Sequence, residues 1–127
     1  IFSTHVKDMA MAESDRGFLL SEVPLGEGIL DLARMIEICR KANPSVWFNL
    51  EMITRDPLSV PVYEDKYWAT MPNLPAPELA RTLALARKGD PGSLPSIKGR
   101  TLGDQISYEE ANIRQSFAYA RESLGCS

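Results

Sequence analysis

Apolar and polar residues alternate in two short stretches of the chain, and each stretch predicts a β-strand. The first covers residues 1–8 (IFSTHVKD) and the second covers residues 45–53 (SVWFNLEMI). In both, every second side chain falls on one face of the strand, and the more polar residues gather on the other face. His5 lies on the polar face of the first strand, and Glu51 lies on the corresponding face of the second.

A helical spacing of apolar residues predicts three helices. The first covers 31–43, where Asp31 is a suitable N-cap and the Asn43-Pro44 pair ends the helix. The second covers 76–88 and begins among prolines, and the third covers 108–124. For the third, Ser107 and Glu110 form a candidate capping box, and a glycine follows the last residue. Residues 9–30, 54–74 and 89–106 are predicted to be loops with at most short turns.

The order strand, helix, strand predicts a βαβ unit with parallel strands, and therefore an α/β fold. Two parallel strands leave two open edges, and a parallel sheet needs both of its faces covered. The pattern thus requires further strands. The chain also opens on Ile1 rather than Met, inside the first predicted strand. We therefore expect Ile1 to be a cut or a missing-sequence boundary.

Composition narrows the class of protein. The 127 residues carry a formal net charge of -3 and are 44% hydrophobic, and Lys and Arg never cluster beyond two in a row. These values argue against a nucleic-acid partner, and no apolar run approaches the length of a membrane span. Cys39 and Cys126 share no metal-ligand spacing, so a reduced, cytoplasmic setting is the simplest expectation.

His5 and Glu51 are the residues most suited to chemistry. Both lie near the C-terminal ends of their strands, which is where parallel barrels carry their active sites. An imidazole and a carboxylate that meet there suit a divalent ion such as Mn²⁺, Mg²⁺ or Zn²⁺. The carboxylate could also exchange a proton with a carbon next to a carbonyl. The alternative for His5 is a structural, hydrogen-bonded histidine, and for Glu51 a solvated carboxylate at the end of a strand.

Three motifs resemble one family. The stretch Thr4-His5-Val6-Lys7-Asp8 resembles the H-x-K-D motif on the seventh strand of xylose-isomerase-like barrels. The stretch 24–28 (PLGEG) resembles their L-G-E-G turn, and 49–52 (NLEM) resembles the L-E motif of their eighth strand. The chain is therefore similar throughout to the C-terminal part of the sugar phosphate isomerase/epimerase family, within the apurinic endonuclease-like superfamily.

That resemblance implies the last two strands of a (β/α)8 TIM barrel, with residues 1–127 as the C-terminal fragment of one domain. It implies that His5 and Glu51 bind one divalent metal ion, and that Glu51 is also an acid/base catalyst. The remaining ligands, a Glu and an Asp on earlier strands, would lie before Ile1. The parent enzyme is then a metal-dependent isomerase or epimerase of carbohydrate metabolism, whereas this chain alone is expected to be inactive.

The resemblance also assigns substrate contacts. Arg16, in the stretch Asp15-Arg16-Gly17, takes the place of an arginine that holds substrate oxygens, with a solvated Arg16 paired to Asp15 as the alternative. Lys7 is a second possible substrate contact, or else part of a strand-end pair with Asp8 that orients the loop. Apurinic endonucleases have D-R-H in this stretch, so Gly17 disfavours a multi-zinc nuclease.

Other readings stay open beside the isomerase. The chain could be a non-catalytic fragment with an incomplete metal site, or part of a sugar-acid or inosose dehydratase of the same superfamily. The expected partner is a small sugar or polyol, without nucleic acid or membrane, and a homo-oligomer is possible.

Overall fold

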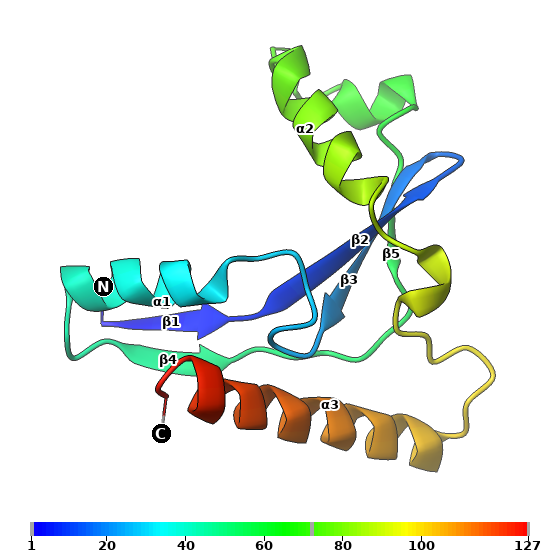
Figure 1. The fold of residues 1–127 in the computed structure, drawn as a ribbon. Coiled ribbons are helices and arrows are strands. Elements are labelled where there is room, and N and C mark those ends of the chain that lie inside the picture. Colours follow the sequence, from blue (N-terminus) through cyan, green and yellow to red (C-terminus); the bar gives the residue numbers. More distant parts are fainter. Residues whose placement is uncertain (1, 72, 127) are drawn as a thin grey trace.

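A computed structural model describes residues 2–71 and 73–126 of the chain. Two small sheets organise it (Figure 1). The first pairs strand β1 (Ser3–Val6) with strand β4 (Trp47–Leu50) in parallel. The second is antiparallel and has the order β2-β3-β5, with β2 at Asp8–Ser14, β3 at Gly17–Val23 and β5 at Leu58–Val60. The predicted α/β class and the parallel pairing are confirmed as a mixed α/β fold.

Three α-helices accompany the sheets: α1 (Leu32–Ala42), α2 (Ala76–Ala86) and α3 (Leu102–Ser123). Two short 3-10 helices lie at Asp65–Trp68 (η1) and Pro91–Ser93 (η2). Helix α1 agrees with the prediction for 31–43, and Asp31 caps it by accepting a hydrogen bond from the Arg34 amide at 3.0 Å. No helix in the described part of the chain is both long and apolar enough to cross a membrane.

The parallel pair has one covered face. Helix α1 lies along β1 and α3 lies along β4 (Figure 1). Their side chains form an apolar cluster in which Leu25, Leu32, Ile36 and Leu124 are buried, and against which Val6 and two β4 residues pack. The opposite face carries the alternate residues, and these are exposed along both strands. The side chain of Trp47 on that face is 76% exposed, because nothing in the described chain covers it.

The segment predicted as the loop 9–30 contains the largest departure from expectation. Most of it is a hairpin of β2 and β3, joined by the two-residue turn Asp15-Arg16 between the paired residues Ser14 and Gly17. The hairpin turn needs Gly17, whose φ is +145°. A Cβ atom at this position would lie 2.4 Å from the carbonyl oxygen of Val60 on β5. Only glycine therefore fits between the hairpin and its third strand without a shift of backbone.

The hairpin and its neighbours form a second apolar cluster. Met11, Phe18, Val62 and Ala86 are buried there, with Leu79 and Leu83 of α2 packed against them. Helix α2 thereby extends from the hairpin, away from α1 (Figure 1). The predicted helix 76–88 is thus present, although it ends at Ala86.

The last helix begins earlier than predicted. It starts at Leu102, and Thr101 is the N-cap, accepting a hydrogen bond from the Asp104 amide at 3.2 Å. The capping box expected at Ser107 is wrong, because the Ser107 hydroxyl donates to the Gly103 carbonyl inside the helix. Gly125, at φ +59°, follows the helix as expected. Of the predicted strand 1–8, Ile1 lies outside the described residues, and β1 covers four of the others. The predicted strand 45–53 is likewise shorter, at four residues.

Buried polar groups fasten α3 to the rest of the molecule. The Asn112 side chain donates to the Thr54 hydroxyl at 2.8 Å, and the Leu25 amide donates to the Ser116 hydroxyl at 3.2 Å. Because Asn112 and Ser116 are both buried, the loss of these bonds would leave unsatisfied groups in the interior. Helix α3 is therefore held in a defined register against β4 and the turn that follows β3.

Candidate metal and acid/base site

The C-terminal ends of β1 and β4 bring His5 and Glu51 together. His5 pairs in register with Asn49, two residues before Glu51, and the Glu51 amide donates to the Val6 carbonyl at 2.9 Å. The Nδ1 atom of His5 lies 3.0 Å from Oε2 of Glu51. The predicted proximity of these side chains on one face of adjacent parallel strands is confirmed. Their roles as metal ligands stay predictions.

Lys7 joins this pair. Its Nζ atom forms a short ion pair with Oε1 of Glu51, so each oxygen of that carboxylate has a partner. Hydrogen bonds from Lys7 and then from His5 lower the pKa of Glu51 below its ordinary value. The bond to Glu51 in turn raises the pKa of Lys7. Glu51 is therefore anionic and Lys7 cationic at neutral pH. A carboxylate has to be anionic to bind a cation or to accept a proton.

Two further residues belong to the site and were missed by the sequence analysis. Glu22, near the end of β3, is only 4% exposed, and its Oε1 atom lies 3.5 Å from both Lys7 Nζ and a guanidinium nitrogen of Arg55. Its Oε2 atom accepts a hydrogen bond from the Ile53 amide at 2.9 Å. We call His5, Lys7, Glu22, Glu51 and Arg55 the strand-end cluster. It contains one histidine, two carboxyl groups and two basic side chains.

A signal for Glu22 was present in the sequence. Its acidic side chain interrupts the apolar run of residues 18–23 (FLLSEV), which follows a short polar turn. Such a run beside a turn is typical of a hairpin strand, and a carboxylate within it requires buried partners. The preceding residues 9–12 (MAMA) have low strand propensity, however, so their own pattern does not indicate the strand that pairs with this run.

Asp8 has a structural role beside the cluster. It is 1% exposed, and its carboxylate accepts hydrogen bonds from four backbone amides, those of Met9, Gly26, Gly28 and Leu30, at 2.9–3.3 Å. The turn 24–28 is thereby tied to the end of β1. Asp8 is thus the loop-orienting residue of the predicted Lys7-Asp8 pair, whereas Lys7 faces the acidic groups.

Arg16 is not brought to the strand-end cluster. It lies in the hairpin turn, where its guanidinium binds the Glu64 carboxylate, with Nε at 2.6 Å from Oε1. Gly17 and Glu22 are five positions apart on the extended strand β3, which corresponds to roughly 16 Å at the usual strand rise. The described geometry therefore gives Arg16 no contact with His5 or Glu51, and its ion pair is with Glu64 rather than with Asp15.

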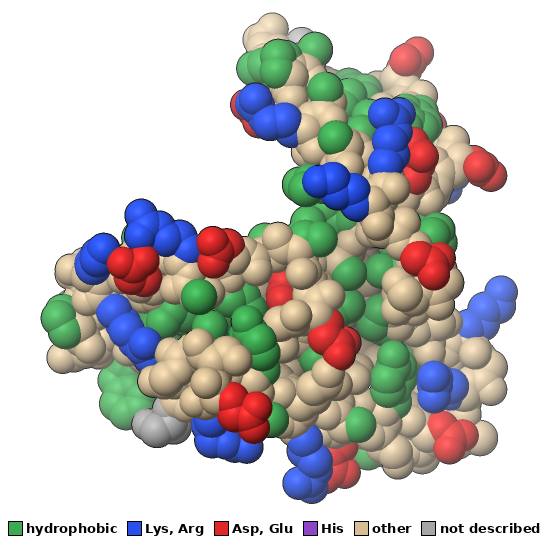
Figure 2. Space-filling model, viewed as in Figure 1, with side chains coloured by type: hydrophobic (Ala, Val, Ile, Leu, Met, Phe, Trp, Pro, Cys, Tyr) green, Lys and Arg blue, Asp and Glu red, His purple; other side chains and the backbone are tan. Residues whose placement is uncertain are grey.

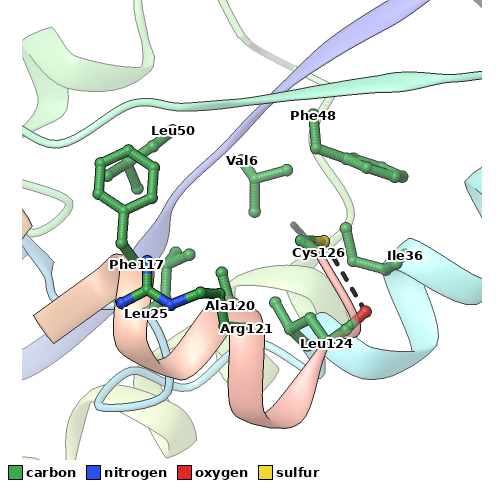
Figure 3. Close-up of a pocket in the computed structure, with 10 residues that line it drawn as sticks. All are labelled: Val6, Leu25, Ile36, Phe48, Leu50, Phe117, Ala120, Arg121, Leu124 and Cys126. Atoms are coloured by element: carbon green, nitrogen blue, oxygen red, sulfur yellow. Dashed lines mark hydrogen bonds between the residues drawn. The ribbon is translucent and has the colours of Figure 1, made fainter. Parts of the chain in front are cut away.

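An apolar recess lies elsewhere in the described part of the chain, away from the strand-end cluster. An apolar cavity of about 120 Å³ lies between the covered face of the parallel strands and α3. Figure 3 shows Val6, Phe48 and Leu50 from the strands above Ala120 and Leu124. The single charged residue in its described lining is the exposed Arg121. Because the cavity lies on the face opposite His5 and offers no acid/base group at its centre, we regard it as a packing gap.

The face of the molecule drawn in Figure 2 shows no patch of a single charge. On the face shown in Figure 2, basic and acidic side chains are interspersed. Among the residues that the structure describes, no group of three or more His, Cys, Asp and Glu side chains is placed to hold a metal ion. His5 and Glu51 are thus two donors of the right chemistry, and a stable site needs further ligands.

Comparison with known proteins adds no assignment. No family model, no curated protein and no solved structure matches this chain.

Proposed function

We propose that this chain is the C-terminal part of a (β/α)8 barrel enzyme, a divalent-metal-dependent isomerase or epimerase acting on a sugar or related polyol. One observation carries the proposal: His5 and Glu51 meet at the C-terminal ends of adjacent parallel strands, on the strand face that lacks a helix. In a parallel barrel that face points to the axis, and that end carries the active site.

An exposed side chain supports the barrel. Trp47 is 76% exposed on the strand face that carries His5. A closed barrel would bury such a group among the side chains of its other strands. Those strands would also supply the additional ligands, as the resemblance to the isomerase/epimerase family implies.

The donor set fits the proposed ion. A neutral imidazole and a carboxylate suit Mn²⁺, Mg²⁺ or Zn²⁺. When bound, the ion would polarise the substrate carbonyl and so acidify the adjacent C–H group. Glu51 is ionised and a third exposed, so it is available both to bind the ion and to exchange the proton on that carbon. His5 would orient the carboxylate through its Nδ1 contact.

A non-catalytic role is the second candidate. Both oxygens of Glu51 are engaged within the chain, and the described residues contain no third ligand. These observations favour a chain in which the cluster is only a structural ion network. A measurement of metal binding to the chain therefore distinguishes the metal-dependent enzyme from the non-catalytic chain.

The test uses the single histidine as its probe. Mn²⁺ added to the whole chain should broaden the ring resonances of His5 in NMR spectra before those of other residues. Glu51→Gln should abolish this selectivity. Glu64→Gln is the matched control, because Glu64 is 28% exposed and pairs with both Arg16 and Lys66, but has no histidine partner. Equal broadening in wild type and Glu51→Gln would contradict the proposed function.

A further inference from the structure

Glu22 is an unusual residue for the end of a mostly buried strand. Its carboxylate is almost completely buried, and a backbone amide and Arg55 hold it from the β4–β5 segment. Burying a carboxylate is costly unless charged partners compensate it. Glu22 is therefore a hydrogen-bond acceptor in a fixed position, because β3 holds its backbone and the Ile53 amide holds its carboxylate.

Lys7 lies between this fixed carboxylate and the candidate ligand. Its ammonium contacts Glu51 and is 3.5 Å from Oε1 of Glu22. An ammonium on a four-carbon stem has three donors and can change partners with a small movement, unlike the rigid guanidinium of arginine. Lys7 thus has two alternative acceptors, the partly exposed carboxylate of Glu51 and the buried carboxylate of Glu22.

The ion pair with Lys7 conflicts with metal binding. A divalent ion between His5 and Glu51 would use a free lone pair of the carboxylate, whose oxygens already have His5 and Lys7 as partners. The ion would also place positive charge near the Lys7 ammonium, and these two positive charges repel. This repulsion drives Lys7 away from Glu51 when the ion enters.

We propose that Lys7 is a built-in counter-ion of Glu51 that moves to Glu22 when a divalent metal ion binds, so that Glu22 is a positioning residue of the site. The inference rests on the proposed function, because it requires that His5 and Glu51 receive the ion. Without metal, Lys7 keeps Glu51 oriented toward His5. With metal, Glu22 accepts the displaced ammonium and keeps it paired.

The experiment measures the apparent Mn²⁺ affinity of the whole chain from the broadening of the His5 resonances. Lys7→Met removes the competing cation and should tighten binding about tenfold, given the Coulomb energies of charges at contact distance. Glu22→Gln removes the negative charge of the alternative acceptor and should weaken binding by about threefold to tenfold on the same basis. Lys66→Met is the control, because Lys66 also pairs with a glutamate, Glu64, and should change nothing.

The double variant distinguishes positioning from a general structural effect. If Glu22 acts through Lys7, adding Glu22→Gln to Lys7→Met should leave the affinity at the Lys7→Met value. A Glu22→Gln loss of equal size in both backgrounds would overturn the inference for Glu22. Weaker or unchanged binding in Lys7→Met would overturn it for Lys7, whose side chain is 34% exposed and whose replacement should leave the fold intact.

Failure of the proposed function looks different. If His5 is not selectively broadened in wild type, or if Glu51→Gln makes no difference, the metal site itself is absent and both proposals fail. If the selective broadening depends on Glu51 while Lys7→Met leaves the Mn²⁺ affinity unchanged, only the counter-ion role proposed for Lys7 is wrong.

Discussion

His5 and Glu51 are 46 positions apart in the chain, yet Nδ1 of His5 lies 3.0 Å from Oε2 of Glu51. The parallel register of β1 and β4 produces this contact, since it aligns His5 with Asn49 and places Glu51 just beyond the last residue pair. The contact depends on strand pairing, and a shift of one residue would turn one side chain to the opposite face.

The ionisation of Glu51 provides a first prediction. Lys7 and His5 hold its pKa below the ordinary value of 4.5 in the folded chain. Such a group contributes stability that is present above its unfolded pKa and is lost as the pH falls through its folded pKa. The contribution is small because Glu51 is a third exposed and solvent screens it. Carbon-13 NMR titration of the Glu51 carboxyl should show a midpoint below 4.5 in wild type.

Lys7→Met tests the cause of that shift. The hydrogen bond from Lys7 is its largest cause, so the variant should move the Glu51 midpoint upward, toward the ordinary value. Lys41→Met is a suitable control: it removes the partner of Glu37, another glutamate with a lowered pKa, and should leave Glu51 unaffected. An unchanged Glu51 midpoint in Lys7→Met would show that the ion pair does not persist in solution.

Asp8 should be the most sensitive polar position of the chain. Four backbone amides donate to its buried carboxylate, and each donor left without a partner costs about 1–3 kcal/mol. Allowing for water entry, we expect Asp8→Ala to lower the free energy of unfolding by about 3 kcal/mol or more. Urea denaturation measures the loss.

Asp31→Ala serves as the comparison, since Asp31 caps one helix with a single exposed hydrogen bond and its loss should cost about 1 kcal/mol. Similar losses in the two variants would mean that the turn 24–28 does not depend on the Asp8 carboxylate.

Gly17 tests the hairpin that the sequence analysis missed. Its φ of +145° and the 2.4 Å approach of a Cβ atom to the Val60 carbonyl oxygen predict that Gly17→Ala is destabilising. We expect a loss of about 1–3 kcal/mol by urea denaturation, from backbone strain of this kind.

Gly99→Ala is the matched control for Gly17→Ala. Gly99 also has a positive φ, +78°, but a Cβ atom there would meet nothing within 4 Å. If both variants lose the same stability, the close approach of β5 contributes nothing beyond the backbone angle.

The sequence predicted the parts of the fold that depend on local patterns. Alternation identified the parallel strands, and Asp31 with the apolar spacing behind it identified α1. It did not predict the hairpin, because the residues of β2 are mostly unbranched and only the pairing with β3 makes them extended. Since Glu22 lies on that hairpin, half of the ionic environment of Lys7 was missed with it.

Helix α3 shows the same limit. Thr101-Leu102-Gly103-Asp104 and Ser107-Tyr108-Glu109-Glu110 both have the spacing of an N-terminal cap, and the spacing alone does not choose between them. In the structure the Thr101 hydroxyl accepts a hydrogen bond from the Asp104 amide at 3.2 Å, whereas the Ser107 hydroxyl donates to the Gly103 carbonyl inside the helix. Propensity alone cannot include such contacts.

The exposed strand face gives the last prediction. Trp47 is 76% exposed there, and one edge of each strand in the pair has no partner strand among the described residues. An apolar surface beside open strand edges favours association, either with further strands of a barrel or with a second copy. In solution, this exact chain should therefore self-associate. Sedimentation velocity should show an average mass that rises with protein concentration.

Trp47→Ser should reduce this association, because it removes the largest apolar side chain of the open face. Leu102→Ser is the matched control: Leu102 is 71% exposed, but it lies at the start of α3, away from the strand face. If both variants reduce association equally, the effect comes from general hydrophobicity. A monomer at every concentration that also unfolds cooperatively would show that the two sheets and three helices suffice by themselves, and the argument for missing barrel strands would lose its main support.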